Sequence, residues 1–166
     1  MIVARFILCV VAILAPTMAA SRGSVLHSGG AWAALDRGSV CEAQTRSLNP
    51  AARNRARAIA GFAFSADRRR WGEFHVRLGR PLRPESSVIL TVGSQPFLLV
   101  ARGDWAWSRG TRQQTAILDA VRGASGMRVE AREPSGRRFT DRYLLDGAPT
   151  AIDAAAARCA SKMLRR

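Results

Sequence analysis

Alternating apolar and polar residues mark the clearest predicted strand, which covers residues 71–78. Its apolar positions lie two apart, at Phe74, Val76 and Leu78. This period of two gives the strand one buried face and one face toward water. Three further stretches combine strand-forming runs with turn residues and predict hairpins or strand pairs: 31–46, 87–101 and 127–145.

The hairpin at 127–145 has a predicted register. Its turn, Glu133-Pro134-Ser135-Gly136, suits a type I turn followed by a bulge. Such a turn places Phe139 opposite Ala131 and Tyr143 opposite Met127, so that apolar residues face one another. A register without the bulge would pair Phe139 with Glu130, and the apolar pairing is favoured.

Two helices are predicted. The first covers 111–121, with Thr111 and Gln114 as a capping box. The second is alanine-rich and C-terminal, with Thr150 and Asp153 in the same capping pattern. One stripe of this helix faces the sheet: Ile152, Ala155, Ala156, Cys159 and Met163. The fold class expected is mostly β, a β-sandwich or barrel-like domain with two helices, the second packed on the sheet.

The N-terminus has the pattern of a cleaved secretory signal peptide over residues 1–20. Arg5 precedes nine apolar residues at 6–14, and small residues follow Pro16. A buried or uncleaved N-terminal helix is the alternative. Residues 21–30 are small and polar and are expected to be a flexible mature N-terminus, followed by one domain over 31–166. The predicted localisation is periplasmic or secreted.

Cysteine usage agrees with export. Of three cysteines, Cys9 lies in the leader, which leaves Cys41 and Cys159. An even pair in an exported chain predicts a disulfide, and Cys159 lies on the helix face that meets the sheet. Two unpaired thiols are the alternative.

Charge is the most unusual property of this 166-residue chain. Lysine and arginine number 26 against 12 acidic residues, giving a net charge of +14, or +13 without Arg5. Lys162 is the single lysine, so genomic base composition also contributes to the arginine content. Six arginines flank predicted strands without a dense acidic neighbour and are the candidate anion-binding surface, the alternative being an ordinary solvated face: Arg53, Arg55, Arg57, Arg68, Arg69 and Arg70.

Trp105 and Trp107 form a second candidate contact surface. They are two residues apart, so a strand would place both indoles on one face, beside Arg102 and Arg109. Such a face could stack a base or a sugar ring. Packing in the core or over a sheet edge is the alternative.

Catalytic constellations are not evident in the sequence. His27 falls in the predicted tail and His75 on the wet face of its strand, so a solvated surface histidine is expected. Asp141 and Asp146 could in principle form a carboxylate pair, but salt bridges to Arg128 or Arg142 are the more ordinary expectation. We expect no enzyme activity, no metal and no cofactor.

Several segments together resemble the invasion-associated locus B family of exported bacterial proteins. They include Trp32 with Cys41, residues 88–99, 127–129 and the run 136–159. The most specific element is Asp-x-Tyr-x-Leu-x-Gly at 141–147, which leads into an alanine-rich helix with a cysteine. The resemblance implies an exported, disulfide-bonded, largely β protein without known catalysis.

Two functions are therefore expected from the sequence. The first is a non-enzymatic envelope protein that acts by surface contact with an envelope or host component. The second is a soluble binder of polyanions such as lipopolysaccharide, acidic lipid or nucleic acid. Export argues against nucleic acid as the physiological partner.

Overall fold

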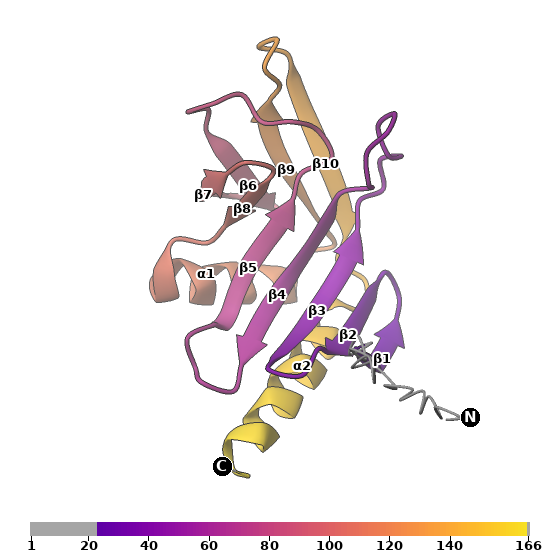
Figure 1. The fold of residues 1–166 in the computed structure, drawn as a ribbon, viewed down its shortest axis with the longest axis vertical. Coiled ribbons are helices and arrows are strands. Elements are labelled where there is room, and N and C mark those ends of the chain that lie inside the picture. Colours follow the sequence, from indigo (N-terminus) through magenta and orange to yellow (C-terminus); the bar gives the residue numbers. More distant parts are fainter. Residues whose placement is uncertain (1–22, 166) are drawn as a thin grey trace, which may run out of the picture.

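Ten antiparallel strands and two helices build the fold (Figure 1). The computed structural model describes residues 23–165, so the predicted leader at 1–20, with Cys9, lies outside the described residues. The strands are β1 Ser24–Gly29, β2 Trp32–Asp36, β3 Val40–Arg46, β4 Ile59–Ser65, β5 Trp71–Arg77, β6 Val88–Val92, β7 Gln95–Arg102, β8 Trp105–Trp107, β9 Gly126–Arg132 and β10 Arg138–Leu144. The helices are α1 Gly110–Gly123 and α2 Ala148–Met163.

The strands follow the order β1-β2-β3-β4-β5-β8-β7-β6-β9-β10 in a single strongly curled sheet. The curl brings β10 back to the chain that leaves β3, where the Leu48 N–H donates to the Arg142 carbonyl at 2.7 Å. A second link joins the Trp32 indole N–H to the Leu144 carbonyl at 2.9 Å. The mostly β fold with two helices is confirmed, and its sheet is closer to an incomplete barrel than to two separate sheets.

The core lies inside the curl. On β5, Phe74 and Val76 are fully buried, while the alternating positions Glu73, His75 and Arg77 stay partly exposed, as the alternation predicts. Phe74 meets Phe62 of β4 edge to face, with ring centroids 5.4 Å apart. The sequence gives no clear signal for β4, because its run Ile-Ala-Gly-Phe-Ala-Phe-Ser is apolar or small at every position and is covered on both faces.

The β9–β10 hairpin has the predicted bulged register. Phe139 lies opposite Ala131, and Tyr143 lies opposite Met127. The turn is closed by the Gly136 N–H, which donates to the Glu133 carbonyl at 2.8 Å. Gly136 has a φ of 85°, the left-handed conformation that the bulge requires.

Helix α2 packs across β1 to β4 and is bonded to β3 by the predicted disulfide. The Cα atoms of Cys41 and Cys159 are 5.8 Å apart, and both side chains are fully buried. Near the C-terminal end of the helix, Arg158 and Lys162 both bind the carboxylate of Asp36 at the end of β2. Disulfide and carboxylate together hold the end of α2 on the sheet.

Three local predictions are wrong. Residues 24–29, expected within a flexible segment, form β1, because the segment pairs with β2 and its Leu26 packs against the core. Helix α2 begins at Ala148 after Gly147, so Thr150 does not cap it, and Asp153 pairs with Arg122 at 2.7 Å instead. At α1 no side chain caps the N–H groups as Thr111 was expected to. Instead the Gln113 side-chain Oε1 accepts a hydrogen bond from the backbone N–H of Arg109, which precedes the helix, at 2.6 Å.

Candidate anion-binding site

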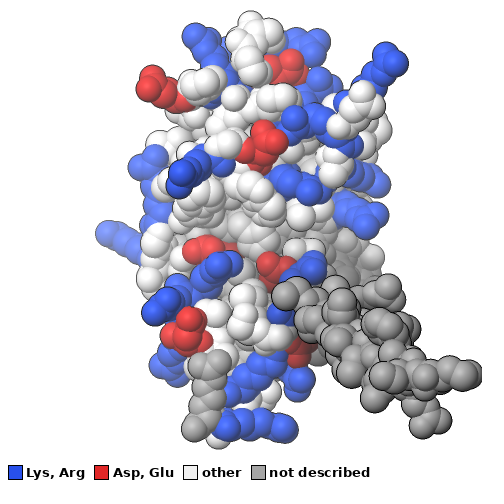
Figure 2. Space-filling view, viewed as in Figure 1, with Lys and Arg blue, Asp and Glu red and all other residues white. Residues whose placement is uncertain are grey.

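The six arginines predicted as one anion-binding surface lie at two separate ends of the sheet. Arg53, Arg55 and Arg57 belong to the loop between β3 and β4, whereas 68–70 belong to the turn between β4 and β5 (Figure 1). The seven-residue strand β4 separates the two groups by about 23 Å. Figure 2 shows lysine and arginine side chains distributed around this face rather than gathered in one patch.

Carboxylates also neutralise half of these arginines. Arg55 Nη2 lies 2.5 Å from Asp104 Oδ2. Arg69 and Arg70 lie 3.6 Å and 3.9 Å from the carboxylates of Asp67 and Glu73. Each group therefore has acidic partners: the β7–β8 turn brings Asp104 to the Arg55 loop, and Asp67 and Glu73 flank 68–70 in sequence.

Trp105 and Trp107 lie on the outer face of the sheet, while Ala106 between them is buried. The Trp105 side chain is 40% exposed, and Arg102 stands directly opposite it on β7. Leu98 and Val100 are exposed on the neighbouring strand. The two indoles therefore share one face, as their spacing predicts, and that face is partly apolar.

His75 lies against this aromatic face and is not the solvated surface histidine expected. Its side chain is only 12% exposed, with Nε2 4.0 Å from Glu42 Oε1 and the ring 6.1 Å from the Trp105 ring. Burial lowers the pKa of His75, with Glu42 opposing the effect. Gly61 leaves room for the imidazole, since a Cβ there would come within 3.2 Å of it.

Asp141 is buried and forms neither of the expected salt bridges. Its Oδ2 accepts the Gly79 N–H at 2.9 Å, while Arg142 points from the opposite face of β10. Burial raises the pKa of Asp141, although the Gly79 N–H and Arg80 oppose the shift. Asp141 therefore anchors the chain that leaves β5, and it does not pair with Asp146.

The strongest concentration of basic side chains on neighbouring strands is on the outer face of the β9–β10 hairpin. Arg132 lies directly opposite Arg138, and Arg128 directly opposite Arg142. We call these four residues the arginine ladder. Like charges at directly opposed positions destabilise a strand pair, so the sequence retains an unfavourable arrangement here. The single carboxylate on this face, Glu130, pairs with Arg128 at 3.2 Å.

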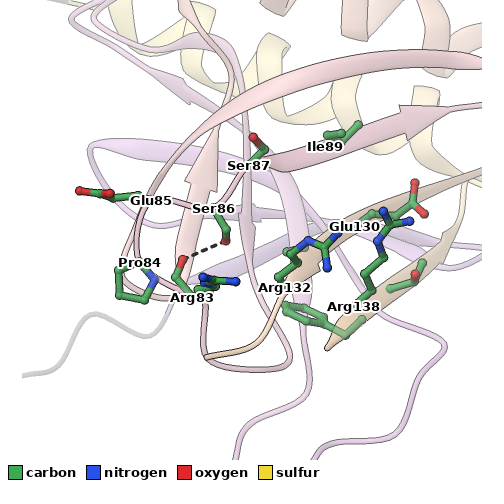
Figure 3. A pocket seen from close by; sticks show the side chains of 12 residues that line it. Arg83, Pro84, Glu85, Ser86, Ser87, Ile89, Glu130, Arg132 and Arg138 are labelled. Atoms are coloured by element: carbon green, nitrogen blue, oxygen red, sulfur yellow. Dashed lines mark hydrogen bonds between the residues drawn. The ribbon is translucent and has the colours of Figure 1, made fainter. Parts of the chain in front are cut away.

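One end of the arginine ladder borders a groove of about 720 Å³ (Figure 3). Arg132 and Arg138 form one wall, and the loop at 83–87 forms the other. Figure 3 shows Arg83 pointing toward Arg132, whereas Glu85 points away from both. Within residues 23–165, none of Arg83, Arg132 and Arg138 forms an ion pair with a carboxylate.

Guanidinium groups in such an arrangement bind phosphate or carboxylate oxygens, often through two parallel hydrogen bonds.

Among the described residues, no group of three histidine, cysteine, aspartate or glutamate side chains is placed to hold a metal ion. Likewise, no helix in the described part of the chain is long and apolar enough to cross a membrane.

Comparisons with known proteins identify the fold but not a family. No family model matches the chain, and no curated protein does. Among solved structures, the chain is similar to the crystal structure of invasion associated protein B from Bartonella henselae, with a TM-score of 0.57. The match has 16% identity and covers 81% of this chain and 98% of that chain. At this identity, the two proteins are related by their fold.

Proposed function

We propose that this protein is an exported, non-enzymatic envelope protein related to the invasion-associated locus B family, and that it acts by surface contact. The observation that carries the proposal is the fold shared with invasion associated protein B. The buried Cys41–Cys159 disulfide supports it, because such bonds persist in oxidising compartments such as the periplasm.

The test is cell fractionation combined with thiol alkylation of the full chain in a Gram-negative host. The expected product lies in the periplasmic or secreted fraction, lacks the leader and shows no alkylation until it is denatured and reduced. Cys41→Ser/Cys159→Ser is the control, because it shows how the protein without the disulfide migrates on a non-reducing gel. A cytosolic protein that keeps the leader, with Cys41 and Cys159 both freely alkylated in addition to Cys9, would contradict the proposal.

Surface contact is tested with a photoreactive amino acid in place of Trp105, which stands on the exposed aromatic face. The same amino acid in place of Asp119, exposed on α1, serves as the matched control. A discrete envelope cross-link from position 105 alone is the expected result. Equal cross-linking from both positions, or none from either, would count against a specific contact surface.

The arginine ladder and its groove favour a second candidate, a binder of polyanions such as lipopolysaccharide or acidic lipid. Attraction between a basic surface and an acidic membrane is worth about 1 kcal/mol per arginine near the lipid and decays over about 8 Å at physiological salt. Binding to vesicles containing phosphatidylglycerol should therefore weaken steeply as salt rises. Undiminished binding at high salt, or equal binding to pure phosphatidylcholine, would refute this candidate.

The two arginine groups at the ends of β4 can be tested separately on the same vesicles. Arg53→Ser/Arg55→Ser/Arg57→Ser and the corresponding change of 68–70 each remove three positive charges. Because each group contains paired arginines, we expect each variant to weaken binding only modestly. A complete loss with either variant would move the contact surface to that end of the sheet.

A further inference from the structure

The groove beside the arginine ladder brings together three arginines, none in an ion pair with a described carboxylate, although Glu85 and Glu130 also line it. Arg132 and Arg138 occupy directly opposed positions of a strand pair, where repulsion is greatest. Glu130, the nearest carboxylate on the ladder, is engaged by Arg128. A carboxylate opposite one of these arginines would relieve the repulsion, and a bound anion would have the same effect.

Backbone hydrogen bonds fix the Arg132 side chain and the Arg83 loop beside the hairpin turn. Arg132 Nη1 donates to the Gly136 carbonyl at 3.0 Å, which fixes its guanidinium at the hairpin turn. The Arg83 N–H donates to the Arg132 carbonyl at 2.8 Å, which ties the 83–87 loop to β9. Arg83 Nη1 also reaches Gly136, where it lies 3.7 Å from the position of a Cβ. Arg83 and Arg132 therefore converge on the same turn.

We propose that this groove binds a phosphate group carrying two negative charges, at Arg83, Arg132 and Arg138. Three guanidinium groups match a phosphate dianion better than the single charge of a carboxylate or a phosphodiester. At about 720 Å³ the groove is much larger than a phosphate, and exposed Ile89 lines it. The phosphate is therefore the anionic part of a larger organic molecule, such as a phosphorylated sugar or lipid headgroup.

This inference rests on the polyanion-binding candidate and gives it a specific site. The hairpin supplies a matched control, because the two arginine pairs of the ladder lie on the same strands and face. Arg132→Gln/Arg138→Gln removes the unpaired pair, and Arg128→Gln/Arg142→Gln removes the pair that Glu130 partly neutralises. Both variants lower the net charge by two, so they differ in site and not in overall charge.

The probes are inorganic phosphate, glucose 1-phosphate, and vesicles carrying either phosphatidic acid or phosphatidylglycerol. Inorganic phosphate and the sugar phosphate distinguish a free anion from a lipid source, and the two lipids distinguish a phosphomonoester from a phosphodiester. For phosphomonoesters, we expect Arg132→Gln/Arg138→Gln to lose on the order of tenfold or more in affinity, from the loss of two charge-assisted hydrogen bonds. The control pair should lose less than about threefold.

Thermal melting provides an independent readout that also checks folding. Phosphate should raise the melting temperature of the wild-type protein and of the control variant, because it binds the folded state. It should leave Arg132→Gln/Arg138→Gln unchanged. Without phosphate that variant should melt close to wild type, because the relieved repulsion offsets the lost hydrogen bond from Arg132 to the Gly136 carbonyl. Equal loss in both variants, or no binding of any phosphomonoester to wild type, overturns the proposal. Salt-sensitive binding to phosphatidylglycerol vesicles would then remain as evidence for the broader candidate function.

Discussion

Removing the Cys41–Cys159 disulfide should cost about 5 kcal/mol of folding free energy. The bond joins residues 118 apart in sequence. In the chain-entropy model, closing a loop of that length removes about 16 cal/mol/K from the unfolded chain, which is about 5 kcal/mol at 25 °C. A domain of this size has about 5 to 15 kcal/mol in total, so the unbonded protein loses a third of its stability or more.

Urea unfolding of Cys41→Ala/Cys159→Ala against the oxidised wild type measures this loss. With a slope of about 2 kcal/mol per molar urea, the midpoint should fall by about 2.5 M. Wild-type protein that has been unfolded, reduced and refolded with reductant present is the control and should match the variant. A loss below about 1 kcal/mol would refute the reasoning, because it would mean that the loop is already constrained in the unfolded chain.

Further predictions concern three single residues. Burial opposes ionisation of Asp36, but hydrogen bonds from Lys162 and Arg158 hold its pKa at about 2, below the ordinary 3.8. The ionised Asp36 therefore contributes its full stabilisation above pH 3.8 and loses it as the pH falls toward 2. Asp36→Asn should lower the free energy of unfolding by about 1 to 2 kcal/mol at neutral pH and by almost nothing near pH 2. Denaturant titrations at both pH values measure this difference. Gly147 has a φ of 81°, and a Cβ there would lie 2.1 Å from the Gly29 carbonyl oxygen. Gly147→Ala should therefore lower stability by about 2 kcal/mol or more in thermal melting, whereas Gly123→Ala in open space at the end of α1 should not. Trp32→Phe removes the indole hydrogen bond to the Leu144 carbonyl and should lower the free energy of unfolding by about 2 kcal/mol, measured by urea unfolding. An unchanged urea midpoint would show that this link between β2 and β10 is dispensable.

The sequence predicts those parts of the fold in which local chemistry and burial agree. The β9–β10 register follows from one turn and two apolar pairs, and the disulfide follows from the helix face that carries Cys159. The strand β4 escapes prediction because both of its faces are covered, so no alternation marks it. The strand β1 escapes because only Leu26 among its side chains packs against the core, so no alternation marks it, and its position depends on pairing with β2.

At the candidate site too, the features that depend on local pairing could be predicted from the sequence, and those that depend on tertiary contacts could not. The six arginines were grouped by their neighbours in sequence, and the curl of the sheet separates them or pairs them with carboxylates such as Asp104. The arginine ladder, in contrast, follows from the predicted register itself, which already places Arg132 opposite Arg138. Only Arg83 could not be placed from sequence, because its loop meets the hairpin through tertiary contacts alone.

Helix α2 follows all ten strands of the described residues in sequence, yet it covers the first four of them. The buried side chains that meet this helix, such as Cys41 of β3 and Phe64 of β4, therefore lack part of their cover until α2 is available. Contacts between such distant segments make folding slow, because a long loop must close before they form. Nascent β1 to β4 would expose this surface until α2 has been synthesised, so we expect the fold to form only after that helix is available.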